Sequence, residues 1–250
     1  MTRPAREAAR WVQLLQARGI AAASLPLIEI GPAPDAAALQ ESRAHLADFA
    51  AVMFVSANAV EGLLPQAGLW PLVGPRAWGP GPGTGAALRR AGVPAERIDL
   101  PPEAAGQFDS EALWQQVRGQ IGAGNRVLIV RGADEQGQPS GRDWLAERLR
   151  ALGAEVLLVA AYRRQRPAWG ESQQRLVTQA AESGGAWWLF SSSEAVANLS
   201  VLCPGLDRAG ARALCTHARI ADAARRAGFG QVAQVVPTLD AVAAFLQSAS

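Results

Sequence analysis

The chain has few of the residues that metal centres and disulfide frameworks require. Its 250 residues include two cysteines, Cys203 and Cys215, and two histidines, His45 and His217. There is no CxxC motif and no Cys/His cluster with metal-ligand spacing. We therefore predict neither a zinc site nor a disulfide framework, and we expect a reducing compartment.

Long apolar runs and strong charge are also absent. No stretch could span a bilayer, and the N-terminal residues MTRPAREAAR are polar with a helical pattern, unlike a signal peptide. The net charge is only +2, and no basic run suggests binding to nucleic acid. These features predict a cytoplasmic protein with neither a membrane nor nucleic acid as its partner.

Common catalytic motifs are missing too. There is no GxSxG elbow and no Walker lysine, and the glycine-rich stretch GPGPGT at 79–84 lacks the GxGxxG spacing of a dinucleotide site. What the sequence does contain is an alternation of apolar strands with helical patterns. The clearest strands are 51–55, 126–130, 155–162 and 187–190. This order predicts a parallel α/β architecture.

The stretch WWLFSSSEAVANL at 187–199 joins a buried strand to a helix through a polar turn. Ser191 and Glu194 stand three residues apart, as in a capping box. A helix N-terminus offers free N–H groups and the positive end of its dipole, so this turn could bind an anion. Taken alone, the stretch is more typical of an ordinary strand–helix corner.

The same turn occurs twice, because the chain is internally duplicated. MFVSANAV at 53–60 aligns with LFSSSEAV at 189–196, and ALRRAGV at 87–93 with AARRAGF at 223–229, both at a shift of 136 residues. LLQARGI at 14–20 aligns with RLRALGA at 148–154 at a shift of 134. Three matches in order predict two similar α/β halves.

The two halves differ at one place. In the second half the strand 126–130 precedes the matching helix, whereas Met1 and Thr2 alone stand in the equivalent place of the first half. A sheet lacking an interior strand leaves backbone groups unpaired. We therefore expect a shortened or mis-assigned N-terminus; the alternative is a first half that lacks this strand.

Several predicted helices begin just after a small polar loop, and Arg3 lies near a further helix start. Such loops lie at the carboxyl ends of parallel strands, where ligands bind. Two facing copies would form a cleft lined by N–H groups, which suits a ligand with many carboxylates. The loops are 56–58, 81–84, 137–142, 191–193 and 216–219.

The chain resembles the uroporphyrinogen-III synthase family over nearly its whole length. The matching pieces are short, and their order makes them specific. They are TRP at 2–4, the P-x-I-E-I strand at 26–30, VMFVSANAV at 52–60, GPGTGAALRRAGV at 81–93, FDSEAL at 108–113, VLIVRG at 127–132, GRDWLAERLRALGAEV from 141 through Tyr162, LFSSSEAV at 189–196 and HARIADAARRAGF at 217–229.

The resemblance implies two flavodoxin-like parallel-sheet domains joined by a two-stranded linker. The Pro-rich breaks at 31–35 and 163–170 fit the two chain crossings. The first domain would then comprise residues 1–30 and 164–250, and the second residues 31–163.

The resemblance also implies an activity: the cyclisation of hydroxymethylbilane to uroporphyrinogen III plus water, with ring D inverted. This is a hydro-lyase step of porphyrin and haem biosynthesis that uses neither a metal nor an organic cofactor. We expect a monomer, and contact with the upstream hydroxymethylbilane synthase is left open. The alternative from another class is a non-catalytic two-domain binding protein for an anionic ligand.

Tyr162 and Thr84 match residues of the family by position, and the other candidates are residues of the polar loops or arginines that could pair with carboxylates. Tyr162, the only tyrosine, would help the hydroxyl group leave as water, or would merely pack at the domain junction. Thr84 could be no more than a helix cap, and Ile220 stands where several relatives carry threonine. Loop arginines are often simply solvated. The predicted substrate-binding residues are Arg3, Ser56, Asn58, Gly83, Thr84, Arg131, Arg142, Ser192, Ser193 and Arg219.

Overall fold

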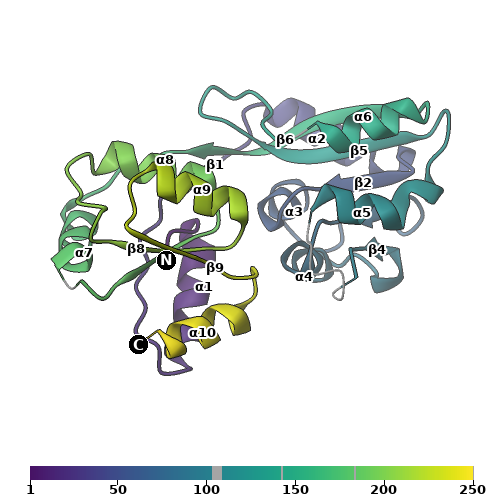
Figure 1. The fold of residues 1–250 in the computed structure, drawn as a ribbon. Coiled ribbons are helices and arrows are strands. Elements are labelled where there is room, and N and C mark those ends of the chain that lie inside the picture. The colour runs from purple at the N-terminus through teal and green to yellow at the C-terminus, as the bar shows by residue number, and fades with distance from the viewer. Residues whose placement is uncertain (103–108, 142, 183, 250) are drawn as a thin grey trace. The chain divides into compact units, whose positions relative to one another are not determined.

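A computed structural model describes residues 1–102, 109–141, 143–182 and 184–249. The chain forms two compact units (Figure 1), unit 1 comprising Met1–Glu29 and Gln165–Ser250 and unit 2 comprising Ile30–Arg164. The crossings occur in β1 (Glu29–Gly31) and at the end of β6 (Glu155–Gln165), which are neighbours in one sheet. The crossings expected from the sequence lie one residue away from these boundaries.

Unit 2 is built on a six-stranded sheet of order β1-β6-β5-β2-β3-β4. The pairings from β6 through β4 are all parallel. The central strands are continuous apolar runs because helices cover both faces of the sheet. This confirms the predicted parallel α/β architecture. The remaining strands are β2 (Ala51–Phe54), β3 (Arg76–Trp78), β4 (Ile98–Asp99) and β5 (Arg126–Ala133).

Alternate residues of β2 and β5 point into two separate cores. Phe54 and Val130 lie in the core beneath α2 (Ala36–Ala44), α3 (Ala57–Leu63) and α4 (Pro82–Arg90). Met53 and Ile129 lie in the core beneath α5 (Ser110–Val117) and α6 (Trp144–Ala151). Three single-turn 3-10 helices complete the described part of this unit: Leu46–Asp48, Ala95–Arg97 and Arg118–Gln120.

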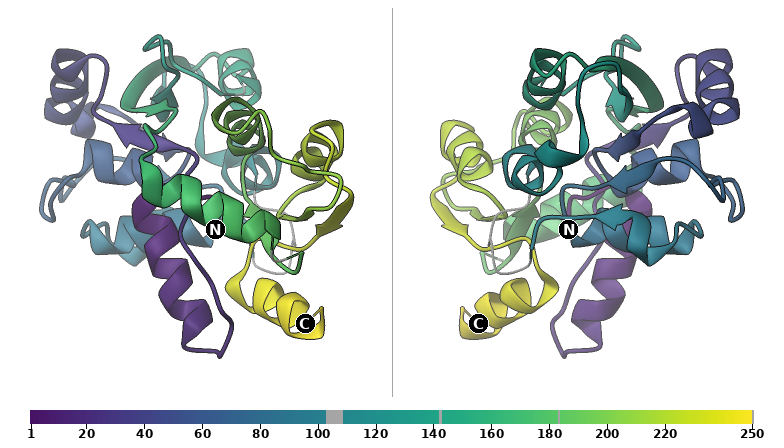
Figure 2. Two further views of the ribbon diagram at one scale, coloured as in Figure 1. Left: turned by 90° about the vertical axis from the view of Figure 1, so that its left-hand side faces the viewer. Right: turned by 90° about the vertical axis from the view of Figure 1, so that its right-hand side faces the viewer.

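Unit 1 has a parallel sheet of order β7-β8-β9, and one core cluster brings α1 and α10 together through Leu15 and Val242. In both views of Figure 2 the N-terminus lies within the body of the unit, whereas the C-terminus lies at its edge. The strands are β7 (Trp187–Phe190), β8 (Arg212–Cys215) and β9 (Gln231–Gln234). The helices are α1 (Ala5–Gln16), α7 (Glu171–Glu182), α8 (Ser193–Leu202), α9 (Ala218–Arg226) and α10 (Leu239–Ser248).

Several predicted boundaries are wrong, and the predicted strands at 51–55, 126–130 and 155–162 end at Phe54, Ala133 and Gln165. Of the strand expected at 26–30, only β1 from Glu29 onward is paired as a strand, since Pro26 has no N–H to donate to a ladder. The helix expected from Gly85 begins at Pro82, because proline suits the first helical position. The helix expected from Ala59 begins at Ala57.

Candidate functional site

Tyr162 lies near the carboxyl end of β6, with its side chain in the core of unit 2. The residue is only 6% exposed and belongs to the core cluster beneath α3. Its hydroxyl lies 3.0 Å from Ser56 Oγ, and either atom could be the donor. The tyrosine is therefore a packed residue whose hydroxyl lies within hydrogen-bonding distance of Ser56.

A backbone irregularity and a glycine make room for this ring. The register of β5 on β6 shifts between Arg131, which pairs with Ala160, and Gly132, which pairs with Tyr162. Bulges of this kind redirect side chains near the end of a strand. A Cβ atom at Gly132 would lie 2.7 Å from Cε2 and Cζ of the tyrosine ring, so no larger residue fits there unless the ring moves.

Ser56 connects the tyrosine to a helix start. It is the N-cap of α3, where its Oγ accepts a hydrogen bond of 3.2 Å from Ala59 N. Asn58, the second residue of α3, is partly buried. The C-terminal end of β2 and the end of β6 thus meet through a serine–tyrosine hydrogen bond.

Arg131 is buried and already has a counter-charge. Its side chain is 4% exposed, and its Nη1 lies 2.8 Å from Asp143 Oδ1. Asp143 is at the N-cap position of α6, and among the described residues its carboxylate caps no N–H of that helix. This ion pair joins the last part of β5 to the residue before α6, across the loop between them. Arg142, also predicted to bind substrate, lies outside the described residues.

The backbone of the first turn of α4 is exposed at Gly83. Its N-cap is Gly81, and Pro82 follows at the first position without an N–H. Gly83 is exposed, and no described atom lies within 4 Å of a Cβ placed there. Thr84 is buried inside the first turn, with its methyl group facing Gly79, so it is not the helix cap. The N–H groups of this turn are available to an anion.

The serine turn of unit 1 differs by one residue from the predicted capping box. Ser192, not Ser191, is the N-cap of α8, because its backbone is extended and its Oγ accepts a bond of 3.2 Å from Glu194 N. Ser193 is the first helical residue, and its Oγ is buried without a hydrogen-bond partner among the described residues.

The turn before α9 is capped by a histidine. His217 Nδ1 accepts a bond of 3.1 Å from the backbone N–H of Arg219, whose side chain is exposed. Ile220 is buried, so the position at which several relatives carry threonine contributes no hydroxyl here. Arg219 is thus free to turn its side chain toward a ligand, while one N–H of its turn is already bound.

Arg3 is held by its own helix. Its Nη1 lies 3.2 Å from Glu7 Oε2, and its guanidinium carbon lies 4.2 Å from the ring centroid of Trp11. Burial lowers the pKa of Arg3, and the neighbouring Glu7 opposes that shift. Neither Arg3 nor Arg131 is therefore a simply solvated loop arginine.

Comparison with known proteins identifies the family. The family model described as Uroporphyrinogen-III synthase HemD matches residues 9–244. The chain belongs to this family. It is 32% identical over 170 residues to the uroporphyrinogen-III synthase of Synechococcus elongatus, a match that covers 66% of this chain and 60% of that relative. The matched part thus spans less than two thirds of that relative.

Solved structures of uroporphyrinogen-III synthases share the fold. A mutant enzyme from Thermus thermophilus superimposes with a TM-score of 0.57 at 18% identity, covering 100% of this chain and 98% of that one. The protein from Helicobacter pylori gives a TM-score of 0.57 at 15% identity, with 90% and 91% covered. At these identities the likeness supports the two-domain α/β fold alone.

Within this member of the uroporphyrinogen-III synthase family, the sequence-based site omitted two residues. Gly132 makes room for Tyr162, and its signal was a glycine inside a buried strand. Asp143 binds Arg131 across a loop, which spacing alone does not reveal. The described ranges contain no group of three or more His, Cys, Asp or Glu side chains that could hold a metal ion. Nor does any described helix have the length and apolarity needed to cross a membrane.

Proposed function

We propose that the chain is a uroporphyrinogen-III synthase, a lyase that converts hydroxymethylbilane to uroporphyrinogen III and water. The observation that carries the proposal is membership of the family over residues 9–244. The hydroxyl of the hydroxymethyl group on ring A leaves as water and gives an azafulvene cation. Ring D then attacks through its substituted carbon, and the spiro intermediate fragments and recloses with ring D inverted.

The main task of such an enzyme is conformational. Hydroxymethylbilane closes without inversion when unassisted, so the protein must bring the substituted carbon nearer to the cation and hinder direct closure. Fixed N–H groups at helix starts can hold carboxylates in place without titrating. The starts of α4 at Gly83 and of α8 at Ser192 and Ser193 are our proposed anchors for the acetate and propionate groups, together with Arg219 on α9.

Tyr162 is the proposed proton donor. Its O–H would protonate the departing hydroxyl as the carbon–oxygen bond breaks, and the proton lost from ring D after closure would restore the phenol. Ser56, 3.0 Å away, could donate to the phenolate formed in between. Arg3 and Arg131 already pair with Glu7 and Asp143, so we propose that they position the loops around the substrate.

We further propose that the protein acts as a cytoplasmic monomer without a metal or organic cofactor. Its substrate would come from hydroxymethylbilane synthase, whether or not the two proteins touch. These proposals rest on the resemblance to the family. Any of them could be wrong while the proposed reaction is right.

A coupled assay tests the proposed reaction. Purified hydroxymethylbilane synthase supplies the substrate, and the oxidised products are separated into isomers I and III. We expect isomer III to exceed isomer I when the chain is present and isomer I to dominate when it is absent. No excess of isomer III would contradict the proposal. Slowed consumption without inversion would instead favour a binding protein for anionic ligands.

A further inference from the structure

Strand β6 contains one residue more than the part of β5 with which it pairs. Arg131 pairs with Ala160 and Gly132 with Tyr162, so the pairing skips Ala161. Successive side chains of a regular strand point to opposite faces of the sheet, and a bulge interrupts that alternation. The bulge at Ala161 therefore decides which face the following residues occupy.

Tyr162 lies on the face that the bulge gives it. Before the bulge, Val159 lies in the core beneath α3, whereas Leu158 packs against the core beneath α5 and α6. Ala161 lies in the core beneath α3, as the alternation predicts, and Tyr162 lies in that same core. In a regular strand Tyr162 would follow Leu158 to the opposite face of the sheet, away from Ser56.

Gly62, inside α3, makes room for this bulge. A Cβ atom placed on Gly62 would lie 2.8 Å from Ala161 Cβ and would also clash with the Ala161 carbonyl oxygen. These atoms belong to the backbone or are attached directly to it, so no side chain can rotate out of the way. Glycine is less favourable than alanine inside a helix. The close approach of α3 to the bulge thus requires a residue that helix formation alone disfavours.

Arg43 of α2 holds the same end of α3. Its Nε donates to Leu63 O at 2.7 Å, and its Nη2 donates to Gly62 O at 3.2 Å. At the other end of the helix, Ser56 Oγ lies 3.0 Å from the hydroxyl of Tyr162. Because α3 has only seven residues, a displacement at its C-terminal end also moves its N-cap. The position of Ser56 therefore depends on how α3 meets the bulge.

We propose that Gly62 is a positioning residue for Tyr162. By letting α3 pack against the bulge at Ala161, it brings Ser56 Oγ and the phenol within hydrogen-bonding distance. The inference rests on the proposed function in one respect, namely that the phenol donates a proton to the departing hydroxyl group. The position of the phenol itself can be measured without any reaction.

Tyr162 supplies the signal that tests the proposal, because it is the only tyrosine of the chain. Tyrosine with an isotope label at Cζ gives one NMR resonance, whose position changes when the phenol gains or loses a hydrogen bond. Ser56→Ala gives the position of that resonance without the serine bond. We expect Gly62→Ala to move the resonance most of the way toward this position. It should also lower kcat for isomer III about tenfold while KM stays unchanged.

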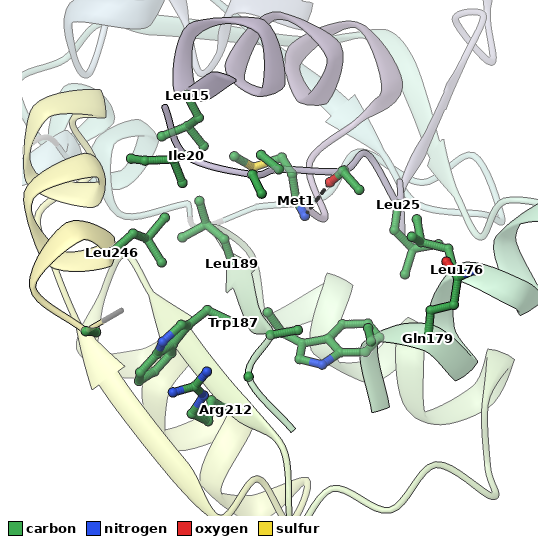
Figure 3. A pocket seen from close by; sticks show the side chains of 18 of the residues that line it. Met1, Leu15, Ile20, Leu25, Leu176, Gln179, Trp187, Leu189, Arg212 and Leu246 are labelled. Atoms are coloured by element: carbon green, nitrogen blue, oxygen red, sulfur yellow. Dashed lines mark hydrogen bonds between the residues drawn. The ribbon is translucent and has the colours of Figure 1, made fainter. Parts of the chain in front are cut away.

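A destabilising change in the other unit controls for a general loss of stability. Leu15 and Ile20 line a cavity of about 1020 Å³ in unit 1 (Figure 3), whereas Gly62 and Tyr162 belong to unit 2. Ile20→Ala removes apolar contacts at the wall of this cavity and should lower the melting temperature by a few degrees. It should neither move the Tyr162 resonance nor change kcat.

Arg43→Met covers the case in which Gly62→Ala does not fold, because it adds no bulk between α3 and β6. It removes the two hydrogen bonds at the end of α3 and should move the resonance in the same direction, by less. The proposal is overturned if the resonance stays in place in every folded variant of the two, or if Ile20→Ala moves it equally.

The positioning role and the proposed reaction can fail separately. A moved resonance with unchanged kcat would uphold the role of Gly62 and contradict proton donation by Tyr162. If the unaltered chain makes no isomer III, the proposed function fails, while the resonance still decides the role of Gly62.

Discussion

At the scale of single residues, Tyr162 is both a core residue and a hydrogen-bonded polar group. It is packed in the core of unit 2, yet its hydroxyl is bonded to Ser56 at the start of α3. Packing keeps the ring in one orientation, and the serine keeps the hydroxyl near a helix N-terminus whose dipole favours a phenolate. The same contacts would serve either a structural tyrosine or an oriented proton donor.

Replacing Tyr162 with phenylalanine separates these roles. Loss of the hydrogen bond should lower the free energy of unfolding by about 1 kcal/mol, as Ser56→Ala should in turn. If the phenol donates a proton, Tyr162→Phe should lower kcat for isomer III by about 100-fold or more, and Ser56→Ala by less. Denaturant unfolding and the coupled assay measure both effects. Unchanged turnover in Tyr162→Phe would reduce the tyrosine to packing.

Gly132→Ala should disturb the same ring from the other side. Its Cβ would lie 2.7 Å from two ring carbons, so the ring or β5 must move. We expect a loss of about 1–3 kcal/mol in unfolding free energy. Gly119→Ala is the matched control, since no described atom lies within 4 Å of a Cβ there. Equal stability of the two variants would show that the ring is not tightly held.

The amino group of Met1 gives a prediction for pH. Burial lowers its pKa from 8.0 to about 6, so between these values the unfolded chain binds more protons than the folded chain. The free energy of unfolding should therefore rise from pH 6 to pH 8, by about 2–3 kcal/mol at most. Urea unfolding at several pH values measures it. Acetylation of the Met1 amino group removes the titrating charge, so the acetylated chain should lack this rise, and an equal rise in both forms would contradict the assignment.

At the level of secondary-structure elements, the chain repeats one motif, in which a buried parallel strand is followed by the N-terminus of a helix with exposed backbone. Three of these starts differ in their caps: Gly81 on α4, Ser192 on α8 and His217 on α9. Only the glycine cap contributes no side chain to the first turn. We therefore expect α4 to be the start most dependent on a ligand carboxylate.

The variant Gly83→Asp tests this expectation, because it should make the protein more stable and at the same time weaken its binding of substrate. A carboxylate in the first turn of α4 should raise the unfolding free energy by about 0.3–1 kcal/mol. It should also raise the KM for hydroxymethylbilane, because it competes for the same N–H groups and repels the substrate. Gly205→Asp, beyond the C-terminus of α8, is the charge-matched control. Equal KM values for the two variants would remove α4 from the proposed site.

The sequence predicted the elements better than their ends. Strands and helices were recognised from the spacing of apolar residues, a pattern to which many residues contribute. The end of an element depends on only one or two residues. Strand β3 was missed because Arg76–Trp78 is too short to show a period. The cap fell on Ser192 instead of Ser191 because adjacent serines are equivalent in sequence and only the backbone distinguishes them.

The candidate site was predictable to a similar degree. Loops after strands were found because parallel strands place their carboxyl ends together. The contact of Gly132 with Tyr162 coincides with a register shift between β5 and β6. A glycine inside a buried strand suggests such a shift, but nothing in the sequence identifies Tyr162 as the residue opposite it. The Arg131–Asp143 pair joins residues 12 apart across a loop, which spacing alone does not reveal.

At the scale of the whole molecule, the chain forms two α/β units, and matching strand–helix turns occur in both. Under the proposed function, the helix starts of the two units would act as repeated anion sites, which suits a substrate bearing several carboxylates.

The proportion of isomer III formed as the chain is added tests the central claim most directly. With hydroxymethylbilane supplied at a fixed rate, isomer III should replace isomer I progressively as the concentration of the chain rises. Catalytic amounts, far below the amount of substrate consumed, should be sufficient. A product that remains isomer I at every concentration of folded chain would contradict the account.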